Sequence, residues 1–163
     1  MKSILSYLSA SLTGLALLAL GLWTFGTGWL IMPGEAQASG HATGTQSAIF
    51  AGGCFWCVES DFDKVPGVLA TTSGYAGGTT QNPTYKEVTY GDTGHYEVVK
   101  VDYDPSKVSY DQLLTAFWHS VDPTDDGGQF CDRGHSYKTA IFTLDDQQGQ
   151  KAIASKKALL DKG

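Results

Sequence analysis

Hydrophobic and polar residues alternate most regularly in the middle of the chain, over residues 95–105. Val99, Val101 and Tyr103 occupy every second position and would form one face of a β-strand. Glu97 belongs to the same face, because it lies two positions before Val99. The pattern therefore predicts a half-buried strand that carries a carboxylate among apolar side chains.

The next segment, residues 109–121, has the 3.6-residue period of an amphipathic helix. Ser109 and Gln112 have the spacing of a capping box, which indicates that the helix begins directly after Ser109. The apolar stripe of this helix consists of Tyr110, Leu113, Leu114, Phe117 and Val121.

Shorter apolar runs, separated by turns rich in Gly, Pro and Asn, predict the other elements. Strands then alternate with helices, so the expected fold class is α/β (α+β), with one layer of helices on a sheet. We expect loops at residues 77–85 and 122–136. The remaining elements are strands at 48–51, 68–76 and 137–144, a helix over 54–64, and a final helix that begins after Asp145 and continues to the last residue.

Residues 1–38 differ from the rest of the chain. An uncharged apolar run of 21 residues, 12–32, is followed by Ala36-Gln37-Ala38, which fits a small-x-small cleavage site. The segment is predicted to be a signal peptide or an N-terminal membrane anchor, since the run also approaches the length of a membrane span. In both cases the domain at 48–163, preceded by a linker at 39–47, is expected to be exported to a periplasmic or extracellular compartment.

The chain has 163 residues and a formal net charge of −6. This length suffices for one domain with its own core. An acidic chain has few groups that neutralise phosphates, so we expect no nucleic-acid partner. Three cysteines cannot all pair with one another, so at least one thiol is predicted to be free or exchanging.

Two of the cysteines form a C-x-x-C, Cys54-Phe55-Trp56-Cys57, directly after Gly52-Gly53. A thiol at a helix N-terminus is favoured as the thiolate by unpaired N–H groups and by the helix dipole. Cys57 would lie on the same helical face, within reach of Cys54 for a disulfide. The spacing alone leaves three interpretations open. The first is dithiol chemistry, as in thioredoxin-like proteins, and the second is inert packing. The third is a zinc site made of Cys54, Cys57, Cys131 and His135.

Five motifs in order give the chain a wider resemblance. They are GGCFWCVES, SGYAGGTTQNPTYKEV, GDTGHYEVVKVDYDP, SYDQLLTAFWHSVDPT and GGQFCDRGHSYKTAIF. Over residues 47–160 the sequence resembles the peptide methionine sulfoxide reductase A family. The resemblance implies a two-layer α/β sandwich with a ferredoxin-like βαβ core. It also implies reduction of the S epimer of methionine sulfoxide, free or in proteins, with thioredoxin or a similar dithiol as the reductant and with no metal or other cofactor.

The resemblance implies roles for the residues that match the family's motifs. Cys54 matches the catalytic nucleophile, and Cys57 matches the thiol that resolves its sulfenic acid. Glu97 matches an acid beside the sulfoxide oxygen, which Tyr85 and Tyr137 also bind. Burial on an apolar strand face raises the pKa of a carboxyl, so a neutral Glu97 would donate a proton to that oxygen.

Three more residues match substrate-binding positions of the family. Phe55 and Trp56 match the aromatic residues that hold the substrate methyl group, and Asp132 matches an acid near the substrate backbone. Cys131 departs from the pattern, because many members carry Asn there, and it is a candidate additional thiol. The chain also ends before a strand and a tyrosine-rich tail that the family usually has, so we expect the domain to be C-terminally truncated. By the same resemblance, the expected form is a monomer that repairs exported proteins.

Overall fold

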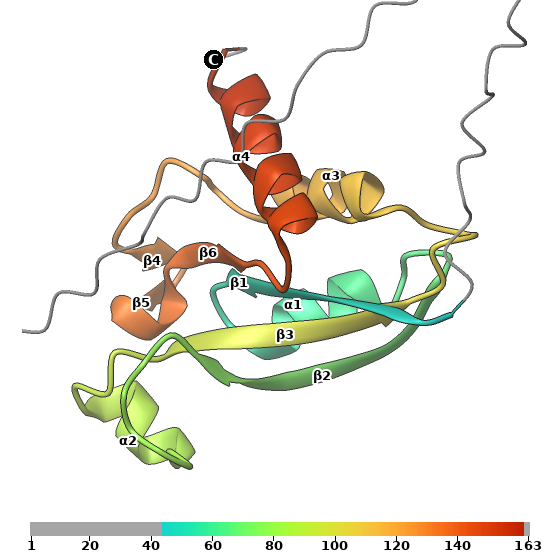
Figure 1. Cartoon of the computed structure of the whole chain (residues 1–163). Coiled ribbons are helices and arrows are strands. Elements are labelled where there is room, and N and C mark those ends of the chain that lie inside the picture. The colour runs from blue at the N-terminus through green and yellow to red at the C-terminus, as the bar shows by residue number, and fades with distance from the viewer. Residues whose placement is uncertain (1–43, 162–163) are drawn as a thin grey trace, which may run out of the picture. The chain divides into compact units, whose positions relative to one another are not determined.

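The computed structural model describes residues 44–161 (Figure 1). The predicted signal peptide or anchor at 1–38, with its apolar run at 12–32, lies outside the described residues. Within residues 44–161, no helix combines the length and the apolar character that a membrane crossing requires. The first strand begins at Gln46, so the end of the predicted linker is already part of the sheet.

A four-stranded sheet forms the centre of the domain. Its strands are β1 (Gln46–Gly52), β2 (Val68–Ala76), β3 (Tyr96–Tyr103) and β6 (Thr139–Phe142), in the spatial order β2-β3-β1-β6. Every neighbouring pair is antiparallel, so β1 runs parallel to β2, and β3 runs parallel to β6. Helix α1 (Phe55–Phe62) connects the first parallel pair, and α3 (Tyr110–Ser120) lies in the connection of the second. These are split βαβ units, and the predicted ferredoxin-like core is confirmed.

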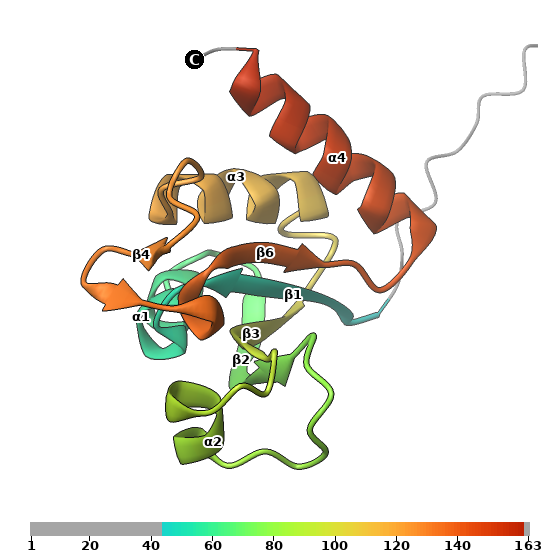
Figure 2. The same cartoon turned by 90° about the vertical axis from the view of Figure 1, so that its left-hand side faces the viewer.

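Helices α1 and α3 pack on the sheet and enclose the core with it (Figures 1 and 2). Phe50 on β1 is fully buried, and its ring stacks on Phe62 of α1 at 4.9 Å and on Phe117 of α3 at 5.0 Å. Val99 and Val101 of β3 are buried in the same cluster, as the alternating pattern predicts. Burial of each such side chain away from water contributes roughly 1.5–3 kcal/mol to the free energy of folding. The two-layer sandwich is therefore confirmed.

Both predicted helix starts in the C-terminal half are confirmed. The side chain of Ser109 accepts from the N–H of Gln112, and Oε1 of Gln112 accepts from the N–H of Ser109, so α3 begins with the expected capping box. Asp145 caps α4 (Asp146–Leu160), which lies against α3. The helix does not continue to the last residue, because it ends at Leu160 with Asp161 as its C-cap.

The loop expected at 77–85 is present up to Thr84, where α2 follows it, whereas the loop expected at 122–136 contains short elements. Helix α2 (Tyr85–Tyr90) begins after Thr84 with a capping box. Strands β4 (Gly128–Gln129) and β5 (Asp132–Arg133) form a hairpin, and η1 (His135–Tyr137) is a single 3₁₀ turn. Elements of two to six residues are too short to show a hydrophobic period, so local hydrogen bonds define them.

Candidate active site

The turn after strand β1 presents Cys54. Gly52 ends β1, and Cys54 is the N-cap of α1. Gly53 joins them with φ +90°, a left-handed conformation that favours glycine. A Cβ at Gly53 would lie 2.7 Å from the Cβ of Gln129, so the β4–β5 hairpin packs directly against this turn. The thiol therefore occupies a fixed place between the sheet and the hairpin.

Cys54 and Cys57 lie one helical turn apart. The backbone N–H of Cys57 donates to the carbonyl oxygen of Cys54 at 3.0 Å. Both thiols are free, with Cys54 half-buried and Cys57 exposed. Partial desolvation raises the pKa of the Cys57 thiol, and its hydrogen bond with the Cys54 side chain raises it further. Cys57 is therefore a protonated thiol at neutral pH.

Glu97 contacts the first turn of α1. Its carboxylate is buried on β3, with 2% of the residue exposed, and Oε2 accepts a hydrogen bond from the N–H of Phe55 at 3.0 Å. Burial raises the pKa of Glu97 by more than the hydrogen bond from Phe55 lowers it, and the charge of Asp132 raises it further. The acid is thus held next to Phe55, the residue that follows Cys54, in surroundings that favour its neutral form.

Three tyrosines gather near Glu97. Tyr85 is the first residue of α2, and Tyr137 is the last residue of η1. Burial raises the pKa of Tyr137 to about 12, and the charge of Glu97 and a hydrogen bond with Tyr85 act in the same direction. Tyr75 pairs with Glu97 across β2 and β3, and it was not predicted as a site residue. Tyr75 lies in the motif SGYAGGTTQNPTYKEV, but its place opposite Glu97 depends on the pairing of β2 with β3.

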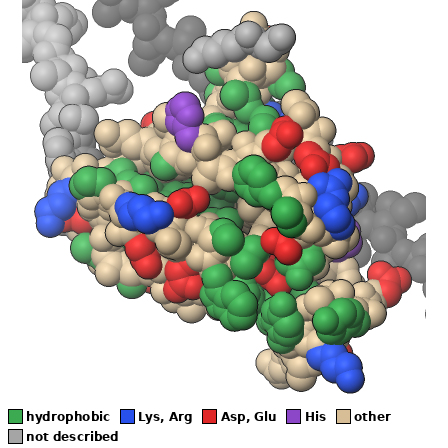
Figure 3. Space-filling view, turned by 180° about the vertical axis from the view of Figure 1, so that it is seen from behind, with side chains coloured by type: hydrophobic (Ala, Val, Ile, Leu, Met, Phe, Trp, Pro, Cys, Tyr) green, Lys and Arg blue, Asp and Glu red, His purple; other side chains and the backbone are tan. Residues whose placement is uncertain are grey.

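Aromatic rings form one side of the site. Phe55 is buried, whereas Trp56 is 64% exposed, and their ring centroids are 5.3 Å apart. The Trp56 ring is nearly parallel to that of Tyr85, at 6.4 Å. Hydrophobic side chains gather in the lower part of the view in Figure 3, on the side of α2. The structure thus places an open aromatic surface beside the two cysteines, where a small apolar group has room to bind.

Asp132 and Cys131 both belong to the β4–β5 hairpin. Asp132 is close enough to raise the pKa of Glu97 and of Cys57 through its charge, so it lies at the site. Cys131 is exposed in the turn of the hairpin. Across residues 44–161, His, Cys, Asp and Glu side chains do not gather in groups of three or more that would hold a metal, so the four residues of the zinc reading are not brought together. Instead, Nε2 of His135 lies 3.0 Å from the carbonyl oxygen of Gly94.

His95 holds the loop that leads to Tyr85. Its ring is buried on the strand side of this loop, where Nδ1 accepts from the N–H of Gly78 at 3.1 Å. Because Nδ1 is an acceptor, the neutral ring carries its proton on Nε2, which donates to the carbonyl oxygen of Thr80 at 2.8 Å. A Cβ at Gly78 would lie 2.5 Å from the His95 ring, so only glycine fits where the loop passes the ring. The two hydrogen bonds of the His95 ring fix the path of this loop to Tyr85.

Substitutions of His95 test whether the two hydrogen bonds of its ring position Tyr85. We expect His95→Ala to lower the rate of the reaction at this site about tenfold, because a displaced loop misplaces the Tyr85 hydroxyl. His95→Asn, which keeps an acceptor for Gly78, should recover part of the loss. In a Tyr85→Phe background, His95→Ala should cost less than about twofold, measured as single-turnover rates. Equal losses in both backgrounds would show that His95 acts on something other than Tyr85.

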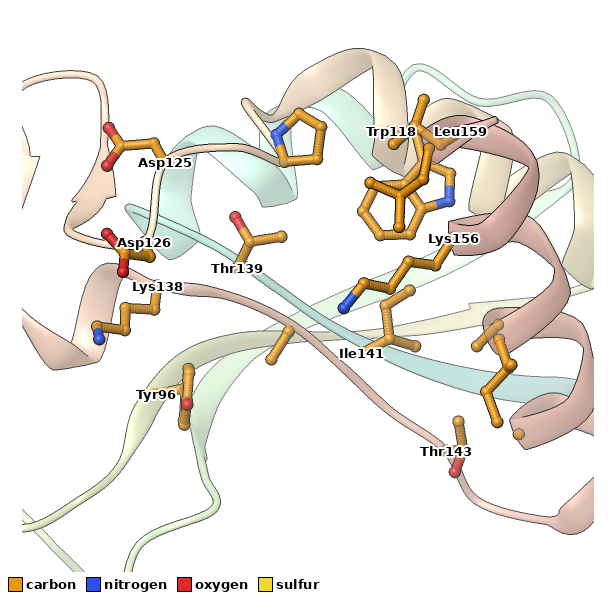
Figure 4. A pocket seen from close by; sticks show the side chains of 16 residues that line it. Tyr96, Trp118, Asp125, Asp126, Lys138, Thr139, Ile141, Thr143, Lys156 and Leu159 are labelled. Atoms are coloured by element: carbon orange, nitrogen blue, oxygen red, sulfur yellow. The ribbon is translucent and has the colours of Figure 1, made fainter. Parts of the chain in front are cut away.

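A cavity lies away from this site, between α4 and β6 (Figure 4). It has a volume of about 500 Å³ and is mostly apolar, with Trp118, Ile141 and Leu159 on its walls. Cys54, Glu97 and the site tyrosines are not among its lining residues. The presence of a cavity therefore does not identify the candidate site in this domain. The thiols, the buried acid and the tyrosines identify it.

The site combines a thiol presented by a turn, a second thiol one helical turn away and a buried acid. These groups define a thiol-based site on a ferredoxin-like fold. Residues 46–163 match the family model of peptide methionine sulfoxide reductase. The chain belongs to this family.

Two curated relatives and two solved structures show how far the likeness extends. The chain is 57% identical to peptide methionine sulfoxide reductase MsrA 2 of Caulobacter vibrioides over 69% of this chain and 56% of the relative. It is 53% identical to MsrA of Bacillus licheniformis over 71% of this chain and 64% of that protein. The chain thus spans less than two thirds of the length of either relative.

Among solved structures, methionine sulfoxide reductase A of Corynebacterium diphtheriae superposes with a TM-score of 0.70 at 39% identity, covering 74% of this chain and 58% of that one. Reduced Mxr1 of Saccharomyces cerevisiae superposes with a TM-score of 0.68 at 28% identity, covering 72% and 70%. The predicted family and fold are therefore confirmed.

Proposed function

We propose that this protein reduces the S epimer of methionine sulfoxide, both in proteins and as the free amino acid. The observation that carries the proposal is the hydrogen bond from the Phe55 N–H to the buried carboxylate of Glu97. It fixes an acid with a raised pKa one residue from a cysteine at a helix start. A sulfoxide needs both groups, because its sulfur accepts a thiolate readily only when its oxygen receives a proton.

The proposed reaction begins with attack of the Cys54 thiolate on the sulfoxide sulfur. Glu97 donates its proton to the oxygen, while the hydroxyls of Tyr85 and Tyr137 donate hydrogen bonds to it. The oxygen is transferred to Cys54, which becomes a sulfenic acid, and methionine leaves. Trp56 and Phe55 provide the apolar surface for the S-methyl group, and Asp132 lies near the substrate backbone.

Recycling follows in two steps. The thiol of Cys57 displaces water from the sulfenic acid, and a Cys54–Cys57 disulfide forms. An external dithiol, thioredoxin or a similar protein, then takes up the oxidation by thiol–disulfide exchange and returns both cysteines to thiols. No cofactor or metal enters this scheme. We further propose that the protein acts as a monomer on exported proteins, because residues 1–38 have the pattern of a signal peptide or anchor.

A stereochemical assay tests the function. The purified protein is supplied with dithiothreitol and with the separated S and R epimers of N-acetylmethionine sulfoxide. We expect steady conversion of the S epimer to the thioether and no conversion of the R epimer above the rate of dithiothreitol alone. The matched control is Cys54→Ser, which should abolish the reaction while the protein remains folded. Equal reduction of both epimers, or full activity of Cys54→Ser, would contradict the proposal.

A further inference from the structure

The tip of the β4–β5 hairpin holds an aromatic residue in an unusual backbone conformation. Gln129 pairs with Asp132, so the turn between the two strands consists of Phe130 and Cys131. Phe130 has φ +52°, a left-handed value that is usually adopted by Asn, Asp or Gly at the first position of a two-residue hairpin turn. A bulky residue in this region is strained, and such strain persists where the surrounding structure holds it. Burial of the Phe130 side chain does not offset this strain, because 73% of the residue is exposed.

The base of the hairpin keeps this tip in place. The buried amide of Gln129 accepts from the N–H of Asp122 at 2.7 Å and donates to the carbonyl oxygen of Asp122 at 2.9 Å. Arg133 donates two hydrogen bonds to the carboxylate of Asp125, at 2.6 and 2.9 Å. A paired, side-chain-anchored hairpin loses little freedom when a ligand binds its tip, so an exposed ring there is well suited to binding.

The tip lies close to the proposed site. Gln129 packs on Gly53, the residue before Cys54, and Asp132 acts on the pKa values of Glu97 and Cys57. Adding these contacts to the usual spacing of Cα atoms puts the Cα of Phe130 at most about 13 Å from that of Cys54. An extended peptide advances about 3.3 Å per residue, so this separation corresponds to about four residues at most.

We propose that Phe130 contacts an apolar side chain of the polypeptide substrate, within a few residues of the oxidised methionine. The inference rests on the proposed function and adds a determinant of which protein segments are reduced well. Methionine is mostly a core residue, so the residues two to four positions away that share its buried face are often apolar, and oxidation disrupts the packing that covers them. An exposed aromatic ring beside the site offers such neighbours a surface, while a free amino acid is too small to reach it.

Three substrates that differ in length and in the side chains around the sulfoxide test this role in the full chain. They are N-acetylmethionine sulfoxide, a pentapeptide with glycines around the sulfoxide, and a pentapeptide with leucines around it, each as the S epimer with dithiothreitol. For Phe130→Ala we expect kcat/KM to fall about fivefold to tenfold on the leucine peptide, through KM. On the other two substrates the change should stay below about twofold. Phe130→Gly, which removes the strained φ as well as the ring, should show the same pattern.

The matched control is Ile153→Ala. Ile153 is also 73% exposed, but it lies on α4 beside the distant cavity. It should leave all three substrates unchanged. Equal losses for both Phe130 variants on every substrate, or no loss on the leucine peptide, would overturn the proposal. A loss that occurs only when thioredoxin replaces dithiothreitol would overturn it too, and would assign the ring to the reductant. Inactivity of the unaltered protein on all three substrates would instead refute the proposed function.

Discussion

Replacing Glu97 with Gln should slow the reduction of the S sulfoxide by about two to three orders of magnitude, because the proton donor is lost while the geometry remains. Gln still offers an oxygen to the Phe55 N–H, so the hydrogen bond of 3.0 Å that positions α1 has a substitute. The measurement is the rate of methionine formation in a single turnover. It separates the chemical step from recycling by the dithiol.

The pH dependence of the rate and of the stability gives a second test of the role of Glu97. Burial raises the pKa of Glu97 above its ordinary value of 4.5, so its proton is lost at a higher pH in the folded protein. The single-turnover rate should therefore decrease as the pH rises through the folded-state pKa, and Glu97→Gln should lack this decrease. The unfolding free energy should also decrease with pH between the unfolded and folded pKa values, because the folded state binds the proton more tightly. The Gln variant should not lose stability over that interval.

Glu59→Gln is the matched control for Glu97. Glu59 lies on α1 and accepts a hydrogen bond from Ser73 at 2.6 Å, and it has no place in the proposed reaction. Its removal should change the single-turnover rate by less than about twofold. A Glu97→Gln variant that kept the normal rate and pH profile would rule out Glu97 as the proton donor.

Replacing Cys57 with Ser should separate reduction from recycling. We expect the variant to form one methionine per enzyme, since Cys54 alone reduces the sulfoxide, and then to stop as the sulfenic acid. Steady-state turnover with thioredoxin should fall about 100-fold or more, because the disulfide that thioredoxin reduces cannot form. Quantifying methionine and trapping the sulfenic acid with a dimedone-type reagent checks both parts.

Cys131→Ser provides the comparison for Cys57→Ser. Both thiols are exposed, but Cys131 lies in the hairpin turn rather than on α1. It should retain steady-state turnover within about twofold if Cys57 alone resolves the sulfenic acid. Normal turnover of Cys57→Ser with thioredoxin would mean that another thiol, Cys131 in the first instance, can take over.

Periodicity predicted the long elements of this fold and missed the short ones. The strand at 95–105 and the helix at 109–121 could be located because each buries a full face, which leaves a repeat in the sequence. Helix α2 and the β4–β5 hairpin bury few side chains and are held by a capping box and by strand pairing. Nothing periodic marks them, although Thr84 and Glu87 have capping-box spacing.

The site residues show the same division. Cys54, Cys57 and Glu97 could be singled out because a local motif or a strand pattern carries each of them. The place of Tyr75 opposite Glu97 depends on pairing between β2 and β3, and the closeness of Gln129 to Gly53 depends on a contact between distant segments. Such contacts exist only after the chain has folded, so a single sequence does not contain them.

The position of α2 outside the sheet has a consequence for local unfolding. Cys54 follows β1, which is paired on both sides, so its surroundings should open only when the whole domain unfolds. Tyr85 stands on a six-residue helix whose one buried residue is Val88, and this helix makes few contacts with other elements. Opening of α2 therefore costs much less free energy than unfolding of the sheet. We therefore expect Cys54 and Tyr85 to belong to separate cooperative units, so that the site opens and closes again while the core stays folded.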